Sequence, residues 1–255
     1  MKVAVCVSGN FKSSSPGDRG LPENYLERNY HNRKKQFPDA DFYYATWSSN
    51  ASIFFNTFPN EKGFIFDEPP THYHPFTKEM PVTEVVKKEY HQTIHSMKYK
   101  GSQRRTSEDT DVIYEWFKHA AKQLVLHSLL LEQIKESYDI IIRTRYDAFI
   151  PDDDSVNFQP FIEKAFFENR VYGFTNANRN KSDLILDEES EKNRSLCRIY
   201  DVLIVHPRNL FDTQKTLHLF EEKKLRGGEY GWHQILSEPY GNNHKNIRGW
   251  VTVLK

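Results

Sequence analysis

The chain has 255 residues, of which 27% are charged and 14% aromatic, and its 35 basic side chains balance its 35 acidic ones. This length fits one large α/β domain with a core that needs no disulfides. Zero net charge excludes an overall attraction to nucleic acid or anionic membranes. The sequence contains no run of roughly 18 apolar residues, so we expect no membrane-spanning helix. Cys6 and Cys197 lack the spacing of a zinc site, so we expect reduced thiols in a cytoplasmic protein.

Strands and helices are predicted in alternation along the first half of the chain. The apolar run Val3–Val7 predicts a buried strand, which Ser8-Gly9-Asn10 ends. The polar stretch 12–36 begins as a loop, and its end is predicted to be helical. The next predicted elements are strands over Asp41–Trp47 and Gly63–Phe66, a helix over Val82–His95, a mobile basic loop over Met97–Arg105 and a long helix over Asp111–Glu136.

The same alternation continues in the second half. Its predicted elements are a strand over Tyr138–Ile150, a helix over Phe161–Phe167, a strand over Arg170–Phe174, a polar surface excursion over Asn176–Arg194, a strand over Ile199–His206, helices over Leu210–Lys223 and Glu229–Ser237, and a last strand over Arg248–Leu254. This alternation is typical of an α/β sheet that is mostly parallel and flanked by helices. Ligands of such sheets bind beyond the carboxyl ends of the strands.

The segment Asp139–Asp147, DIIIRTRYD, combines three isoleucines with charges at alternate positions. If the strand extends through it, Arg143, Arg145 and Asp147 project from one face. Two arginines and a carboxylate at the end of a buried strand are costly to leave unpaired. Two explanations stand about equally on this pattern. One is an Arg–Asp network that supports the sheet edge, and the other is a site where Asp147 holds Mg²⁺ or Mn²⁺ and the arginines bind a diphosphate.

Four short motifs recur together in one group of enzymes. They are Ser8-Gly9 at the end of the first strand, Thr46-Trp47 at the end of an aromatic strand, the run RTRYD that ends at Asp147, and Tyr200-Asp201 in a later strand. In this respect the sequence resembles a small group of GT-A-type glycosyltransferases from capsule, lipopolysaccharide and viral or phage sugar-transfer systems. The resemblance spans residues 3 to about 236, and only the RTRYD run is specific.

The resemblance implies a GT-A-like, Rossmann-related fold with a central mixed, mostly parallel sheet. It implies one glycosyltransferase domain, 1–255, in which 1–150 bind the nucleotide sugar and 151–255 bind the acceptor. Asp147 takes the place of the usual DxD metal motif, with Mn²⁺ or Mg²⁺ as cofactor. Arg145 stands where a second acid is usual, so arginine could replace part of the cation's charge. The implied donor-binding residues are Ser8, Gly9, Asn10, Lys12, Arg143, Arg145 and Asp147.

An inverting transferase needs a general base to deprotonate the acceptor hydroxyl, whereas a retaining one does not. Asp201 is the first candidate because of the resemblance. Glu229 and His233 follow, since they lie one helical turn apart and share a face. A core or surface position is the alternative for His233. Trp47 and Trp232 are candidates to stack on a base or sugar ring, with packing in the core as the alternative.

The expected activity is transfer of a sugar from a nucleoside-diphosphate sugar to an acceptor hydroxyl, in the cytoplasm or, for a viral protein, the host cytoplasm. A bacterial surface glycan, a viral glycan and a hydroxymethylated DNA base are the acceptors considered. A basic groove near 98–105 would suit DNA, although the neutral charge disfavours it. The alternatives are a nucleotidyltransferase, for which Ser8-Gly9-Asn10 is a poor phosphate loop, and a non-catalytic nucleotide- or glycan-binding module.

Overall fold

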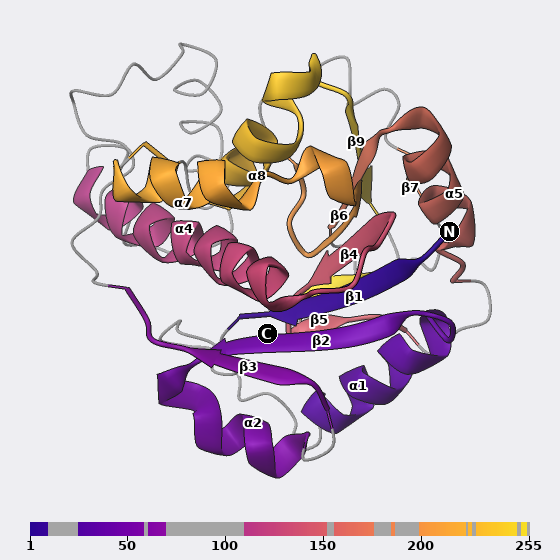
Figure 1. Cartoon of the computed structure of the whole chain (residues 1–255), viewed down its shortest axis with the longest axis horizontal. Helices are drawn as coiled ribbons and strands as arrows, with labels where there is room; N and C mark the ends of the chain where they lie inside the picture. Colours follow the sequence, from indigo (N-terminus) through magenta and orange to yellow (C-terminus); the bar gives the residue numbers. More distant parts are fainter. Residues whose placement is uncertain are drawn as a thin grey trace.

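The computed structural model describes residues 1–9, 25–58, 61–69, 110–151, 156–175, 185–186, 199–222, 224–225, 228–248 and 251–253. Helices lie on both faces of a central sheet (Figure 1). The strands are β1 (Val3–Ser8), β2 (Asp41–Trp47), β3 (Gly63–Phe66), β4 (Ile140–Thr144), β5 (Ala148–Phe149), β6 (Val171–Thr175), β7 (Ile185–Leu186), β8 (Leu203–Pro207), β9 (His244–Arg248) and β10 (Thr252–Val253). The α-helices are α1 (Tyr25–Gln36), α2 (Ala51–Thr57), α4 (Thr110–Gln133), α5 (Gln159–Glu168), α7 (Thr213–Glu221) and α8 (Gly228–Leu236).

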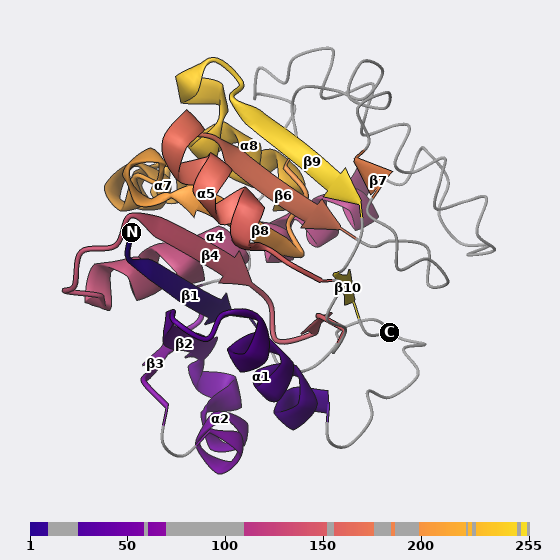
Figure 2. The same ribbon diagram turned by 90° about the vertical axis from the view of Figure 1, so that its right-hand side faces the viewer.

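The main sheet has the strand order β3-β2-β1-β4-β8-β6-β9-β7. Strands β3, β2, β1 and β4 are parallel, β8 runs antiparallel to both β4 and β6, β9 is parallel to β6, and β7 is antiparallel to β9. The predicted fold class, α/β with a mixed and mostly parallel central sheet flanked by helices, is therefore confirmed. The carboxyl ends of β1, β4, β6 and β9 point to the side of the molecule where β5 and β10 lie (Figure 2).

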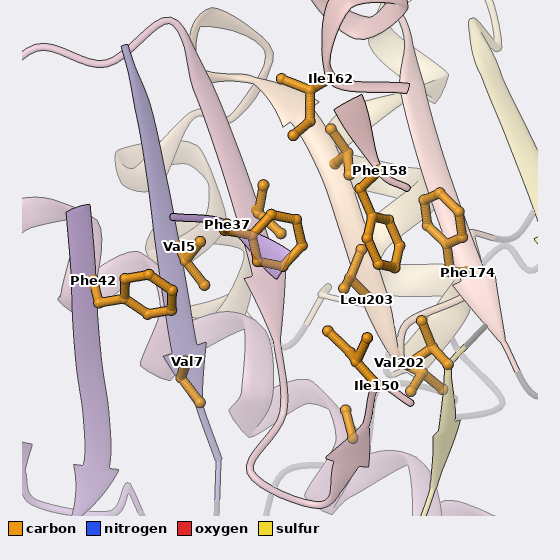
Figure 3. Close-up of a cluster of buried hydrophobic side chains, with 14 of the residues drawn as sticks. Val5, Val7, Phe37, Phe42, Ile150, Phe158, Ile162, Phe174, Val202 and Leu203 are labelled. Atoms are coloured by element: carbon orange, nitrogen blue, oxygen red, sulfur yellow. The ribbon is translucent and has the colours of Figure 1, made fainter. Parts of the chain in front are cut away.

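The sheet buries a different set of side chains on each face. Val5 and Val7 of β1 pack in a cluster with residues of α1, α2 and α5, part of which is shown in Figure 3. Ala4 and Cys6 of the same strand pack in a second cluster with α4, α7 and α8. Helices on both faces explain why Val3–Val7 of β1 and Ile140–Ile142 of β4 are continuous apolar runs rather than alternating ones. Burial raises the pKa of the Cys6 thiol to about 12, so it is an unreactive core residue.

Several predicted elements agree with the structure. The strands over Asp41–Trp47 and Gly63–Phe66 are confirmed with those bounds, and the N-terminal strand extends by one residue to Ser8. The helices α1, α4, α5, α7 and α8, the strand β6 and the strand β8 are confirmed within a few residues at each end. The predicted helix 82–95 and basic loop 97–105 lie outside the described residues, as does Cys197.

Three predictions were wrong in extent or type. The strand predicted over 138–150 is two strands, β4 and β5, because Ala148 N–H donates to the Arg145 carbonyl at 3.2 Å and closes a turn between them. The last strand, predicted over 248–254, is replaced by β9 and the two-residue β10. The excursion predicted over 176–194 contains β7, which pairs with β9.

Gly173 lets the segment 199–201 lie directly against β6. A Cβ atom at this position would lie 2.7 Å from both Ile199 Cγ2 and the Tyr200 carbonyl oxygen. We expect Gly173→Ala to lower the free energy of unfolding by about 2 kcal/mol, because the neighbouring backbone must shift. Urea denaturation measures this loss, and an unchanged midpoint would show that the segment is not packed as described.

Two histidines are fully buried between α4 and the sheet. His127 of α4 and His206 of β8 lie with ring centroids 6.0 Å apart, and His127 also contacts Trp232. Neither ring nitrogen of His127 has a hydrogen-bond partner among the described residues. Burial lowers the pKa of His206 to about 4, and it lowers that of His127 well below its usual range, assisted by the charges of His206, Arg143 and Arg208.

The buried histidines make the protein less stable in acid. Between pH 6.5 and 4 the unfolded chain binds protons that the folded chain does not, so the free energy of unfolding falls as the pH falls. His206 alone accounts for a loss of roughly 3 kcal/mol over this window. Urea denaturation at pH 7 and pH 4.5 tests this, with His127→Leu expected to show a shallower fall than wild type. An equally steep fall in His127→Leu would contradict the buried neutral state of His127.

Candidate functional site

The site lies where the strand order reverses. The chain leaves β1 for β2 and β3 on one side and then returns to place β4 on the other side of β1. In open α/β sheets, the crevice beyond the carboxyl ends of the two strands at such a switch point is where ligands bind. Three segments meet there: Ser8-Gly9 at the end of β1, the turn Arg145–Ala148 after β4, and Asp201 before β8. Asp201 lies at this edge because β8 is antiparallel to β4 and pairs Leu203 with Thr144.

Arg145 and Asp147 form a bidentate ion pair on the turn after β4. Arg145 Nε donates to Asp147 Oδ1 at 2.8 Å and Nη2 donates to Oδ2 at 2.6 Å. Their side chains are 26% and 18% exposed, so the pair is accessible but partly desolvated. Burial acts to lower the pKa of Arg145, but the charges of Asp147 and Asp201 and the hydrogen bond to Asp147 outweigh it and raise that pKa. Arg145 is therefore a permanent cation that uses two of its five N–H donors on Asp147.

Arg143, in contrast, is fully buried. Its Nη1 donates to the Asp201 carbonyl, its Nη2 donates to Gln123 Oε1 at 2.8 Å, and its guanidinium lies 4.9 Å from the centroid of the Trp232 ring. Burial lowers the pKa of Arg143 to about 10, although the charge of Asp201 opposes this. Arg143 thus links α4, α8 and the segment before β8 from inside the protein.

The prediction that the three charged residues project together from one strand face is wrong. Arg143 belongs to β4, whereas Arg145 and Asp147 belong to the following turn, so the alternation of a strand does not apply to them. The set is nevertheless gathered by other means: the charges of Asp147 and Asp201 both act on Arg143 and on Arg145. Two cations and two carboxylates therefore form one electrostatically coupled group around the end of β4.

The end of β1 is held next to this group. Gly9 has a φ of +148°, an unusual conformation for any residue with a Cβ atom, and its N–H donates to the Ala45 carbonyl at 3.3 Å. Its own carbonyl accepts from Thr46 Oγ1 at 3.0 Å. Ser8 is buried, and its Oγ has no hydrogen-bond partner within the described ranges, which a bound ligand could supply. Asn10 and Lys12 lie outside the described residues.

The three candidates for a general base lie in different surroundings. Asp201 is partly exposed and is the candidate whose charge reaches both arginines. Glu229, also partly exposed, lies in the first turn of α8 and next to the same segment, because its carbonyl accepts from Ile199 N–H at 3.0 Å. His233 is 2% exposed, and its Nε2 is 2.9 Å from Asn242 Oδ1, an environment typical of a structural histidine.

Neither candidate tryptophan is exposed to a ligand. Trp232 is fully buried and stacks on the Arg143 guanidinium, and Trp47 is 3% exposed within the core cluster on the α4 face. The structure therefore favours the core-packing alternative for both rings.

Three buried polar residues of α1 were missed by the sequence analysis. Asn29, Asn32 and Arg33 all donate to backbone carbonyls in the stretch 145–150. The available signal was their spacing with Leu26: positions 26, 29 and 33 share one helix face, and that face carries polar residues where a core face is expected.

The described residues hold no group of three or more His, Cys, Asp or Glu side chains that could bind a metal ion. Both carboxylate oxygens of Asp147 already accept hydrogen bonds from Arg145. Mg²⁺ in nucleotide sites commonly uses only one or two carboxylates together with substrate phosphates. A divalent cation at this turn would therefore need oxygen ligands beyond the side chain of Asp147, such as those of a bound phosphate.

No protein-family model matches the sequence, and no curated protein matches it. Among solved structures, the chain is similar to 4-diphosphocytidyl-2C-methyl-D-erythritol synthase from Anaerococcus prevotii, with a TM-score of 0.46 and 6% identity over 97% of this chain and 89% of that one. It is similar to S. aureus TarS 1–349, with a TM-score of 0.46 and 11% identity over 99% of this chain and 60% of that one. It is also similar to the galactosyltransferase LgtC in complex with donor and acceptor sugar analogs, with a TM-score of 0.41 and 9% identity over 96% of this chain and 73% of that one.

Identities and scores this low do not transfer an activity to this chain. Separately, none of the described helices is long and apolar enough to cross a membrane.

Proposed function

We propose that the protein is a glycosyltransferase that moves a sugar from a nucleoside-diphosphate sugar to an acceptor hydroxyl. The observation that carries this proposal is the partly exposed Arg145–Asp147 fork on the turn at the topological switch point. This is the position where open α/β sheets bind nucleotides. The RTRYD run that forms the turn is also the specific part of the resemblance to GT-A-type glycosyltransferases.

Arg145 is the residue we assign to the donor diphosphate. Its N–H donors beyond the two that bind Asp147 suit phosphate oxygens, and its raised pKa keeps the guanidinium charged. A positive group fixed in a partly desolvated site stabilises the negative charge that develops on the departing nucleoside diphosphate. The Gly9 backbone and the buried Ser8 hydroxyl are proposed to contact the nucleotide, since they lie at the end of the adjacent strand.

A divalent cation, Mn²⁺ or Mg²⁺, is proposed to accompany the diphosphate, with Asp147 as its protein ligand. Such a cation would neutralise phosphate charge and so help the leaving group to depart. Arg145 already supplies positive charge at this turn, so the cation adds to its effect rather than replacing it.

Asp201 is the residue we propose as general base if the reaction inverts the sugar configuration. It is partly exposed and lies beside Arg143 and Arg145. It belongs to the second part of the chain, 151–255. This placement agrees with a division of labour in which residues 1–150 bind the donor and residues 151–255 bind the acceptor. A cytoplasmic site of action is proposed because nucleotide sugars are the substrates.

A panel of nucleotide sugars tests the proposal, with release of nucleoside diphosphate measured with and without Mn²⁺. We expect one nucleotide sugar to be hydrolysed slowly, because water replaces the missing acceptor. Release of pyrophosphate from a nucleoside triphosphate and a sugar phosphate would instead show a nucleotidyltransferase. Binding without turnover of any donor, even with candidate acceptors added, would show a non-catalytic module. Each of the latter two results overturns the proposal.

A further inference from the structure

The turn that carries Arg145 and Asp147 rests on three buried polar side chains of α1. Asn29 is 0% exposed, Arg33 1% and Asn32 7%. Asn29 Nδ2 donates to the Tyr146 carbonyl at 3.0 Å, and Asn32 Nδ2 donates to the Ile150 carbonyl at 2.7 Å. Asparagine and arginine are seldom buried to this degree unless their polar groups are hydrogen bonded, because desolvating them is costly.

Arg33 makes the most concentrated of these contacts. Its Nη2 lies 2.9 Å from the Arg145 carbonyl oxygen, 3.0 Å from that of Tyr146 and 3.4 Å from that of Ala148. Three carbonyl oxygens that converge in a buried place repel one another, and a cationic donor between them offsets both the repulsion and their loss of water. Without this charge, the repulsion between the carbonyl oxygens and their lost hydration would favour a different conformation of the turn.

These bonds fix more than the carbonyl groups. A peptide unit is planar and trans, so its N–H points opposite to its C=O. Because the Tyr146 carbonyl faces Asn29 and Arg33, the N–H of Asp147 is directed away from α1. These bonds therefore fix the orientation of the Asp147 backbone, and the Asp147 side chain in turn binds Arg145.

We propose that Asn29 and Arg33 are positioning residues that preorganise the Arg145–Asp147 fork for a nucleoside diphosphate. The effect on diphosphate binding rests on the proposed glycosyltransferase function, whereas the effect of the two residues on the shape of the turn does not. They act through the turn and touch no substrate. Burying these two polar side chains destabilises the fold, but it holds the Arg145–Asp147 pair in one geometry before the donor arrives.

Asn29→Ala is the main test variant, because it removes one donor and leaves the Arg33 charge in place. Asn243→Ala is the matched control. Asn243, which is partly exposed, also donates its Nδ2 to two backbone carbonyls, those of Asn169 at 2.9 Å and of Glu168 at 3.4 Å, but it does so at the amino end of β6, away from the site. Arg33→Met and Arg33→Lys form a second pair that separates the charge from the guanidinium shape.

Two readouts are measured on each variant. The first is hydrogen exchange of the Ala148 amide, which closes the turn onto the Arg145 carbonyl. The second is calorimetric affinity for the nucleoside diphosphate, from a panel of common ones, that binds wild type most tightly. We expect Asn29→Ala to speed Ala148 exchange and weaken that affinity, each about tenfold, and Arg33→Met to weaken affinity about 100-fold. Asn243→Ala should change neither, and Arg33→Lys should recover part of the affinity.

The readouts separate the possible failures. Unchanged Ala148 exchange in Asn29→Ala would overturn the positioning role. Faster exchange with full diphosphate affinity would show that α1 supports only the fold, which also overturns it. If wild type binds no nucleoside diphosphate, the proposed function fails and with it the preorganised phosphate site, while the exchange data still decide whether α1 sets the turn. If Arg33→Met does not fold, the comparison of Asn29→Ala with Asn243→Ala remains decisive.

Discussion

Replacing Arg145 with methionine is expected to lower kcat/KM for the nucleotide-sugar donor at least about 100-fold while leaving the protein folded. The reason is that Arg145 is the accessible cation of the site, with N–H donors beyond those that bind Asp147. Methionine replaces the apolar stem of the side chain but removes the charge and all five donors. Donor hydrolysis kinetics measure the effect, with the thermal midpoint recorded to confirm folding.

Arg170→Met is the matched control for this change. Arg170 is also a partly exposed arginine, 31% exposed, in an ion pair with Glu168 at 2.8 Å, but it lies just before β6 at the opposite end of the sheet from the site. It should lose a similar, small amount of stability and no activity. Equal kinetic losses in the two variants would mean that the Arg145 effect is a general one, and the assignment of the diphosphate to Arg145 would then fail.

Asp147→Asn is expected to lower donor turnover by about 100-fold as well, for two separable reasons. Asparagine cannot neutralise Arg145, and it cannot hold a divalent cation as well as a carboxylate does. Since Asp147 orients Arg145 through both oxygens, the two residues act as a unit. The double variant Arg145→Met, Asp147→Asn should therefore be little worse than either single variant.

A titration with Mn²⁺ distinguishes the two contributions of Asp147. If Asp147 holds the cation, Asp147→Asn needs more Mn²⁺ to reach half of its maximal rate than wild type does. If Asp147 serves only to orient Arg145, the Mn²⁺ dependence stays the same and only the maximal rate falls. Identical turnover of wild type and Asp147→Asn at all Mn²⁺ concentrations would contradict both roles.

The strands that were predicted well are those whose pattern depends on burial alone. Asp41–Trp47 and Gly63–Phe66 are short runs of aromatic and apolar residues with polar or proline-containing ends, so local sequence determines both their type and their bounds. β9 was missed because its sequence, HKNIR, has one strongly apolar residue. It is a strand because it pairs with β6 and β7, and such long-range pairing leaves little trace in the local sequence.

The structure of the candidate site also depends on long-range contacts that the local sequence does not reveal. The alternation Arg143, Arg145, Asp147 imitates a strand, yet the strand ends at Thr144. The turn that follows it is bonded to α1, more than 110 positions earlier in the chain: Arg33 donates to the Arg145 carbonyl over a separation of 112 residues. A contact of this range cannot be read from the RTRYD run itself.

The end of β4 at Thr144 also places Arg143 and Arg145 in different surroundings, although the sequence pattern treated them as equivalent. Arg143 is fully buried against Trp232 and Gln123, whereas Arg145 is 26% exposed on the turn. The pattern located a group of interacting charges at the end of β4. The tertiary structure separates an internal link, Arg143, from the residue that can reach a ligand, Arg145.

Binding of nucleoside diphosphates to wild type and to Arg145→Met tests the central claim most directly. A thermal-shift screen of nucleoside diphosphates and nucleotide sugars, with and without Mn²⁺, shows which ligand binds the folded state, because such binding raises the midpoint. We predict that one nucleoside diphosphate and its sugar conjugates stabilise wild type selectively and that Arg145→Met loses this stabilisation while Arg170→Met keeps it. Stabilisation by none of these ligands, or equal stabilisation of wild type and Arg145→Met, would contradict a donor-diphosphate site at this turn.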